Sequence, residues 1–359
     1  MNFSNLQPLG WSNYFLQQLV QKTAQQTDSQ LSFEEMMAFR ITAIHRNRIE
    51  AIGEDGICEL MCPVQFHPIS QHLAVGDWVI ADSVQEHLRI SLIIQAKNRI
   101  ERFAKNQTQV IAANLDYLWI ITSANDEFNL KRLQRYLALA YEFNIEPVVV
   151  LTKTDLCSND VVDDLLDQIR LLNVHLTHAI SVNDELSLRG LHTYFQQGNS
   201  IALVGSSGVG KSTLINSLIG TGQATQSIRA DDAKGKHTTT HRQLFFLPTS
   251  HGQVAIIDTP GMRELQLANA EQGIEQTFTD IVELSQQCKF SDCGHSSEPG
   301  CAIQSALSTG VLTHTHLNNY LKLLKEDEFL KRRDIGAHAE KQHERAFFKM
   351  IHSMRTESW

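Results

Sequence analysis

The sequence predicts three successive domains: a β-barrel of the OB type, an α/β domain, and a helical domain that carries a cluster of cysteines. Three observations lead to this fold class. Short alternating strands fill residues 38–112, strands alternate with helices over residues 113–276, and cysteines crowd together in the mostly helical residues 277–359. A chain of 359 residues is long enough for several hydrophobic cores.

The composition predicts a globular protein without a membrane span. Hydrophobic residues make up 42% and charged residues 20% of the chain, and no run of about 18 apolar residues occurs. The N-terminus lacks the basic start and apolar segment of a secretory signal, so we expect a cytoplasmic location. The net charge of −9 weighs mildly against indiscriminate nucleic-acid binding.

Residues 1–37 form an N-terminal extension that is rich in glutamine and contains the amphipathic patch WSNYFLQQLVQKT. Two interpretations of this segment stay open. It forms one or two helices docked on the next domain, or it is a loosely attached extension. The sequence gives no indication of its role.

The predicted barrel spans residues 38–112. Its strands are the short alternating runs AFRITAIHR, RIEAIG, GICELMC, DWVIADSV and LRISLIIQAK, which turn residues such as Gly53 and Gly76-Asp77 separate. About five short strands at this spacing favour an OB-type barrel. An SH3-like barrel remains the alternative, because periodicity alone does not separate the two.

The central residues 113–276 alternate between buried strands and helices. The strands are expected at YLWIITSA, EPVVVLT, THAIS, SIALVG and QVAIID. Amphipathic helices are expected between them, beginning with NLKRLQRYLALAYEF. This alternation predicts a parallel sheet that is covered on both faces.

The stretch GSSGVGKS matches the phosphate-loop pattern G-x4-G-K-S between a strand and a helix. Glycines let backbone N–H groups turn towards phosphate oxygens, and the following helix points its positive end at them. Lys211 is expected to reach the β- and γ-phosphates, and Ser212 to bind magnesium. The residues expected around the phosphates are Gly205, Ser206, Ser207, Gly208, Val209, Gly210, Lys211, Ser212 and Thr213.

Two further segments are typical of nucleotide switches. The strand AIIDTPGM ends in Asp258, which is expected to hold magnesium through water, and Gly261 is expected to offer its N–H to the γ-phosphate. Upstream, DDAKGKHTTTHRQL is a polar loop that suits closure over the metal. Of Thr238, Thr239 and Thr240 we favour Thr239 as the magnesium ligand. For AIIDTPGM the structural alternative is a strand followed by an ordinary Pro-Gly turn.

The turn TKTD, residues 152–155, follows a buried strand and resembles a guanine-reading turn. A carboxylate at Asp155 accepts hydrogen bonds from the base N1–H and its exocyclic amine, which adenine cannot supply. The stem of Lys153 is expected to cover the base, and Thr154 lies between these two residues. Thr152 stands where asparagine is usual. Ser181, at the end of the next strand, matches a second base-contacting loop.

These elements occur in a rotated order along the chain. The base-reading loops come first, then the phosphate loop, then the two switch segments. The sequence therefore predicts a circularly permuted P-loop GTPase, in which the spatial sheet is kept while the termini move. The chain leaves this core just after the second switch segment.

Cys288, Cys293, His295 and Cys301 follow the pattern Cys-x4-Cys-x-His-x5-Cys. Three thiolates and one imidazole complete a tetrahedral zinc set with no open position, so the predicted site is structural and not catalytic. Such binding contributes about 10 kcal/mol or more to the folding of a small module. The surrounding stretch FSDCGHSSEPGC is polar and contains glycine and proline, as a loop around a metal requires.

Together these motifs resemble the circularly permuted, ribosome small-subunit-dependent GTPase A proteins of bacteria. The resemblance covers about residues 38 to 359 and rests on the stretches QVIAANLDYLWIITSANDEFNLKRLQRYL, TKTDL, GSSGVGKST, GKHTTTHRQL, DTPGMRELQL and FSDCGHSSEPGCAI. It implies a protein, expected to be monomeric, that binds the small ribosomal subunit and its rRNA, hydrolyses GTP with magnesium faster when bound, and acts late in subunit maturation. The N-terminal extension and some barrel strands depart from the family.

Two hypotheses concern residues around this chemistry. Met262 stands where Ras-like switches place a water-positioning glutamine, so we favour His237 for that role, with a purely structural His237 as the alternative. For RNA contact we consider the barrel face and the C-terminal cations Lys331, Arg332, Arg333, Lys341, Arg345 and Lys349.

Two other functions remain open. One is a GTP-dependent metal-handling chaperone, in which the Cys/His set carries cargo zinc. The other is a nucleotide-gated RNA-binding scaffold with little turnover. Loss of the fold on chelation of the metal would favour structural zinc over the chaperone. Multiple-turnover hydrolysis of GTP would exclude the scaffold.

Overall fold

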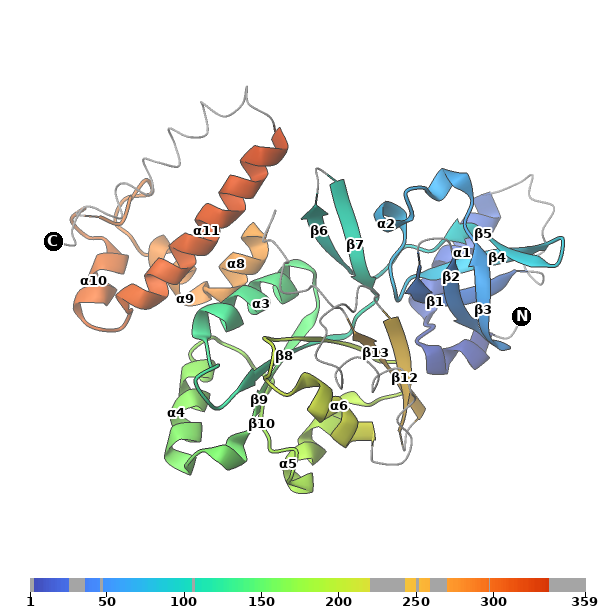
Figure 1. The fold of residues 1–359 in the computed structure, drawn as a ribbon. Coiled ribbons are helices and arrows are strands. Elements are labelled where there is room, and N and C mark those ends of the chain that lie inside the picture. Colours follow the sequence, from blue (N-terminus) through green and yellow to red (C-terminus); the bar gives the residue numbers. More distant parts are fainter. Residues whose placement is uncertain are drawn as a thin grey trace. The chain divides into compact units, whose positions relative to one another are not determined.

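The computed structural model describes most of the chain, which divides into two compact units (Figure 1). The first unit comprises Met1–Asn129 and Phe143–Leu265, and the second comprises Leu130–Glu142 and Gln266–Trp359. No helix among the described residues is long and apolar enough to cross a membrane. The described residues are 3–25, 36–45, 48–104, 107–219, 243–249, 252–258, 270–296 and 298–335.

The N-terminal extension forms a 3-10 helix and an α-helix, η1 (Phe3–Leu9) and α1 (Asn13–Gln25). Their apolar side chains pack on the barrel. The Trp11 ring lies edge-on to Trp78 at 4.9 Å between centroids, and Phe3 stacks on Trp11 at 5.1 Å. Buried aromatic rings of this size make docking favourable, since each removes a large apolar area from water. The interpretation as docked helices is therefore confirmed for residues 3–25.

Five strands after the extension close into a barrel (Figure 1). The pairing order is β1-β2-β3-β5-β4, a further β1–β4 pairing closes the ring, and β3 runs parallel to β5. Strand β2 alternates buried and half-buried side chains, as a barrel wall requires. This connectivity confirms the OB type over the SH3-like alternative. The strands are β1 (Met37–Ile44), β2 (Ile49–Gly53), β3 (Gly56–Met61), β4 (Trp78–Val84) and β5 (His87–Ile93), with η2 (Val64–Phe66) and α2 (Ile69–His72) between β3 and β4.

A separate two-stranded sheet follows the barrel, formed by β6 (Arg99–Ala104) and β7 (Gln107–Ala113). Arg99 on β6 donates from Nη2 to both carboxylate oxygens of Asp77, at 3.0 and 3.1 Å. The side chain of Asp77 also accepts from the N–H of Ala74 at 2.8 Å. Burial outweighs these partners and raises the pKa of Asp77 to about 6.

The α/β part of the first unit is built on a mainly parallel sheet, with order β10-β9-β8-β11-β13-β12. Only the last pair, β13 and β12, is antiparallel within this order. Strand β12 also pairs with barrel strand β1, at Gln243 and Ala43, so the two sheets are continuous. The strands are β8 (Tyr117–Ser123), β9 (Glu146–Thr152), β10 (Thr177–Ala179), β11 (Ser200–Val204), β12 (Gln243–Thr249) and β13 (Gly252–Asp258).

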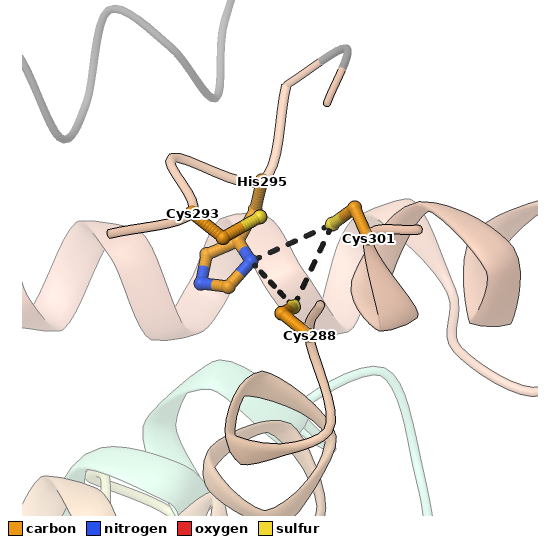
Figure 2. A group of neighbouring side chains, drawn as sticks. All are labelled: Cys288, Cys293, His295 and Cys301. Atoms are coloured by element: carbon orange, nitrogen blue, oxygen red, sulfur yellow. Dashed lines mark hydrogen bonds between the residues drawn. The ribbon is translucent and has the colours of Figure 1, made fainter. Parts of the chain in front are cut away.

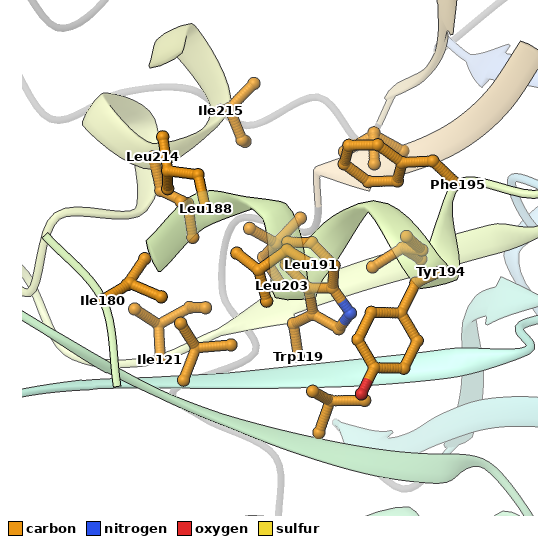
Figure 3. Close-up of a cluster of buried hydrophobic side chains, with 14 of the residues drawn as sticks. Trp119, Ile121, Ile180, Leu188, Leu191, Tyr194, Phe195, Leu203, Leu214 and Ile215 are labelled. Atoms are coloured by element: carbon orange, nitrogen blue, oxygen red, sulfur yellow. The ribbon is translucent and has the colours of Figure 1, made fainter. Parts of the chain in front are cut away.

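A hydrophobic core lies between this sheet and its helices (Figure 3). The ring of Trp119, 1% exposed, stacks on Phe195 and meets Tyr194 edge-on, at 5.9 Å between centroids in both cases. Ile121 and Leu203 from neighbouring strands pack in the same cluster. The helical elements of this part are η3 (Thr154–Leu156), α4 (Asn159–Arg170), α5 (Glu185–Arg189), η4 (Gly190–Tyr194) and α6 (Lys211–Ile219).

The second unit combines one helix from the middle of the chain with the C-terminal helices. Gly273 lets α8 (Glu271–Thr277) approach α3 (Leu130–Glu142) closely, because a Cβ atom there would lie 2.0 Å from the carbonyl oxygen of Ala138. Gln134 is fully buried and bonds to His316 Nδ1 at 3.0 Å and to Asn319 Nδ2 at 2.9 Å. The helices are α3 (Leu130–Glu142), α8 (Glu271–Thr277), α9 (Thr279–Gln286), α10 (Ala302–Ser308) and α11 (His314–Ile335).

Candidate nucleotide-binding and metal sites

The phosphate-loop segment follows β11 directly and leads into α6. Gly205, Gly208 and Gly210 have positive φ angles of 150°, 80° and 95°, which favour glycine. At Gly205 a Cβ atom would lie 2.4 Å from the carbonyl oxygen of Ile121, so a side chain has no room. Because α6 begins at Lys211, its free N–H groups face the end of this loop, as anion binding requires.

The side chain of Lys211 folds back over the loop. Its ammonium donates to the carbonyl oxygens of Gly205 at 2.9 Å and Ser206 at 2.7 Å. The Ser206 hydroxyl lies 3.4 Å from a carboxylate oxygen of Glu127. Of the other predicted residues, Val209 is buried, Ser207 is exposed in the loop, and Ser212 and Thr213 lie in the first turn of α6.

The turn after β9 is joined to the phosphate loop by two side chains. The hydroxyl oxygen of Thr152, 2% exposed, lies 2.6 Å from the Val209 carbonyl oxygen and 3.0 Å from that of Thr122. Lys153 has a φ angle of 61°, and its ammonium donates to the Gly208 carbonyl oxygen at 2.7 Å. Two loops more than 50 residues apart in the chain therefore form one surface.

Asp155 lies in η3 and meets the loop after β10. The hydrogen bond from Ser181 is the main cause that holds the pKa of Asp155 below its ordinary value; desolvation opposes it, and the hydrogen bond from Asn183 adds to the lowering. The amide nitrogen of Asn183 lies 3.1 Å from Asp155 Oδ2. The predicted residues Asp155 and Ser181 thus come together, and Thr154 connects to the same loop through its N–H and the Ile180 carbonyl oxygen at 3.4 Å. Asn183 was not among the predicted residues.

Most of the switch predictions fall outside the described part of the chain. Asp258 ends β13, and its side chain is not among those described. The remaining predicted switch residues, which lie outside the described residues, are His237, Thr238, Thr239, Thr240, Gly261 and Met262.

The four predicted zinc ligands converge between α9 and α10 (Figure 2). Their ligand atoms all lie within 4.8 Å of one another. Cys288 Sγ is 3.9 Å from Cys301 Sγ, and His295 Nδ1 is 3.4 and 3.5 Å from these two sulfurs. A tetrahedral zinc ion separates its sulfur and nitrogen ligands by roughly 3.5–3.8 Å, given usual bond lengths. Cys293 completes the set, which fits the ion.

The backbone around the cluster supports this arrangement. Glu298 accepts hydrogen bonds from the N–H groups of Gly294 and Ser296, at 3.0 and 2.8 Å, on either side of His295. Gln304 donates to the His295 carbonyl oxygen at 2.6 Å. Burial lowers the pKa of His295, which favours the neutral imidazole that ligates metals.

The described C-terminal cations already have acidic partners, on the preceding turn of α11 and, for Lys331, also on α8. Lys331 lies 2.8 Å from carboxylate oxygens of Glu271 and of Asp327, and Arg332 lies 3.4 Å from Glu328. The side chain of Arg333 and all of Lys341, Arg345 and Lys349 lie outside the described residues.

Comparisons of the sequence with a family model and with known proteins give the same family. The RsgA GTPase family matches residues 93–268. Small ribosomal subunit biogenesis GTPase RsgA 2 of Vibrio vulnificus is 41% identical over 329 residues, which cover 90% of this chain and 88% of that protein. The protein of the same name from Listeria monocytogenes is 37% identical and covers 98% of this chain and 97% of its own.

Two solved structures share the fold. YjeQ from Thermotoga maritima has a TM-score of 0.59 at 24% identity, covering 83% of this chain and all of that one. YloQ, described as a circularly permuted GTPase, has a TM-score of 0.57 at 23% identity, with coverage of 84% and 99%. The predicted order of barrel, permuted α/β core and Cys/His-containing helices is confirmed. With relatives of this identity over nine-tenths of its length, the chain belongs to the RsgA GTPase family.

Proposed function

We propose that this protein is a magnesium-dependent GTP hydrolase that binds the small ribosomal subunit and assists its late maturation. The observation that carries the proposal is the pair of bonds from Thr152 and Lys153 to the phosphate loop, since one nucleotide needs both loops at once. The names of the relatives, small ribosomal subunit biogenesis GTPases, support the ribosomal partner. Such a partner also supports the expected cytoplasmic location.

In this proposal the first unit binds the base and the phosphates. Asp155, supported by Ser181, accepts the N1–H and the amine of guanine, while Lys153 covers the base plane. The loop from Gly205 to Thr213 surrounds the phosphates, and Lys211 exchanges its carbonyl partners for phosphate oxygens. Backbone N–H groups held in place by glycine conformations act as electrostatic catalysts, because they need no reorganisation as charge develops.

The switch residues complete the proposed site. Ser212 of the phosphate loop and Thr239 would hold magnesium, and Asp258 would help to hold it through water. Gly261 contacts the γ-phosphate, and His237 positions the attacking water. Magnesium supplies charge neutralisation between the phosphates when bound. If His237→Ala left subunit-stimulated hydrolysis unchanged, the role of His237 would be abandoned.

The zinc ion is proposed to be structural, with Cys288, Cys293, His295 and Cys301 as its ligands. All four positions of a tetrahedral ion are then filled by protein, which leaves none for a substrate. A cargo-zinc chaperone would release its metal to a chelator and keep its fold. Loss of helical circular dichroism on metal removal, restored by zinc alone, supports a structural site.

The proposal is tested by hydrolysis of GTP and ATP with and without purified small ribosomal subunits. We expect multiple turnover confined to GTP and stimulated by the subunit, with Lys211→Ala as the inactive control. Equal use of ATP would exclude the base-reading role of Asp155. GTP-specific turnover that the subunit leaves unchanged would exclude the ribosomal stimulation, and single turnover alone would favour the scaffold alternative.

A further inference from the structure

We infer that Asn183 is a specificity-determining residue, which holds the carboxylate of Asp155 in the orientation that accepts both donors of a guanine base. The inference rests on the proposed function, since it concerns the same base site. Asn183 does not form part of the predicted TKTD turn or of the short strand before Ser181. Only its contacts in the structure place Asn183 at the base site.

Asn183 is fixed at both its backbone and its side chain. Its N–H donates to the hydroxyl oxygen of Ser181 at 3.1 Å, and its side-chain amide donates to Asp155 Oδ2 at 3.1 Å. Ser181 is itself 5% exposed and therefore well anchored. The carboxylate thus has two polar neighbours, a hydroxyl and a neutral amide, on the same loop.

The loop that carries Asn183 is closed by further hydrogen bonds. The Ser187 hydroxyl oxygen accepts from the Ser181 N–H at 3.1 Å and lies 2.8 Å from the Asp184 carbonyl oxygen. Asp184 caps α5 by accepting from the Leu186 N–H at 3.0 Å. Because these bonds fix the turn, the backbone of Asn183 is held in place before any base binds, and its exposed side chain already contacts Asp155 Oδ2.

Orientation matters because a carboxylate turns freely about its last torsion angle. To accept two parallel donors, both oxygens of Asp155 must lie in the plane of the base. Each carboxylate oxygen has two acceptor positions, so Oδ2 can keep its bond to Asn183 and still accept from the base. A neutral donor also leaves the negative charge of Asp155 in place for that contact.

The test compares dissociation constants of GDP and inosine diphosphate, measured by displacement of a fluorescent GDP analogue. The two ligands differ only in the exocyclic amine, so damage to folding or to the phosphate loop affects both equally. We expect Asn183→Ala to reduce the preference for GDP about threefold to tenfold. Glu185→Gln, two residues along on the exposed first turn of α5, serves as the control and should keep the preference.

A double-mutant cycle separates this inference from the proposed function. In an Asp155→Ala background, Asn183→Ala should change the preference no further, because Asn183 acts through Asp155. If the unaltered protein prefers GDP and Asn183→Ala weakens both ligands equally, the inference fails and the proposed function stands. If the unaltered protein shows no preference for GDP over inosine or adenosine diphosphate, both fail together.

Discussion

At the scale of single residues, the hydroxyl of Thr152, which stands where asparagine is usual in a guanine-reading turn, connects this turn to the phosphate loop. It is buried and lies 2.6 Å from the carbonyl oxygen of Val209 in the phosphate loop. The same hydroxyl oxygen lies 3.0 Å from the Thr122 carbonyl oxygen on β8, the strand between β9 and β11. The substitution therefore keeps the connection between the two loops.

Replacing Thr152 with valine tests this connection, because valine keeps the shape and loses the hydroxyl. We expect GDP affinity to fall about tenfold, since the Val209 carbonyl loses a buried donor worth roughly 1–3 kcal/mol. Calorimetric titration of GDP measures the change. Thr152→Ser, which keeps the hydroxyl, should bind nearly normally, and equal affinities for the two variants would refute the role of the hydroxyl.

Asp77 predicts a pH dependence of stability in the first unit. Its pKa is raised from 3.8 to about 6, so the folded state holds its proton more tightly than the unfolded state. The stability that this provides is complete below pH ~4 and is lost as the pH rises through about 6. Relative to Asp77→Asn, the protein should lose up to roughly 3 kcal/mol between pH 4 and pH 8.

Denaturant unfolding of both proteins across this pH range measures the difference. Asp77→Asn cannot titrate at this position, so effects of all other groups cancel in the comparison. A difference that grows in favour of the unaltered protein at high pH would show that the Arg99 pair at 3.0 Å outweighs burial.

At the scale of elements, the loop between α9 and α10 is held by Glu298, which is not one of the four proposed zinc ligands. Glu298 receives two backbone N–H groups on either side of His295. Partners of this kind orient metal ligands, and their loss typically lowers metal affinity 10- to 100-fold. Loss of Glu298 should therefore lower the zinc affinity of this loop even though the four proposed ligands are unchanged.

We expect Glu298→Ala to lower zinc affinity about 10-fold or more, measured by competition with a chromophoric chelator. Asp292→Ala provides the control, because Asp292 is an exposed acidic residue of the same loop. Equal affinities for the two variants would mean that the ligand geometry is set by the helices alone.

At the scale of the whole molecule, one fully buried cation joins three parts of the first unit. Arg40 of β1 donates to the carbonyl oxygen of Leu9 in the extension at 2.5 Å and to the Ser200 hydroxyl of β11 at 2.7 Å. It also lies 3.4 Å from the Asn114 carbonyl oxygen. Burial lowers its pKa to about 10, which still leaves it charged at neutral pH.

Arg40→Met should destabilise the protein by about 3 kcal/mol or more, because several buried acceptors lose their donor together. Arg48→Met is the matched control in the same barrel. Arg48 is 54% exposed and pairs with Glu50 and Glu59, so its loss should change stability by less than about 1 kcal/mol. Equal thermal shifts for both variants would contradict the joining role of Arg40.

The positive φ angles of Gly205, Gly208 and Gly210 and the convergence of the four Cys/His side chains could be expected from the sequence, because glycine positions and residue spacing are local properties. The sequence does not predict Arg40, since alternation in AFRITAIHR places that residue on the polar face of a strand. The structure buries both faces of β1, because the extension and the α/β sheet cover the outer one. The sequence does not predict the role of Asn183 either, because this role depends on a contact with Asp155, which lies 28 residues away in the chain.

The pairing of β12 with β1 has a consequence for how this protein can be divided. The α/β sheet does not end at β12 but continues into the barrel through Gln243 and Ala43. A fragment that begins after the barrel would lose the Ala43 partner of Gln243 and leave this end of β12 unpaired, and unpaired strand ends favour association with other chains. Nucleotide hydrolysis is therefore best studied in fragments that keep the barrel. In a fragment without it, a loss of activity has to be compared with the solubility of the fragment before it is assigned to the site.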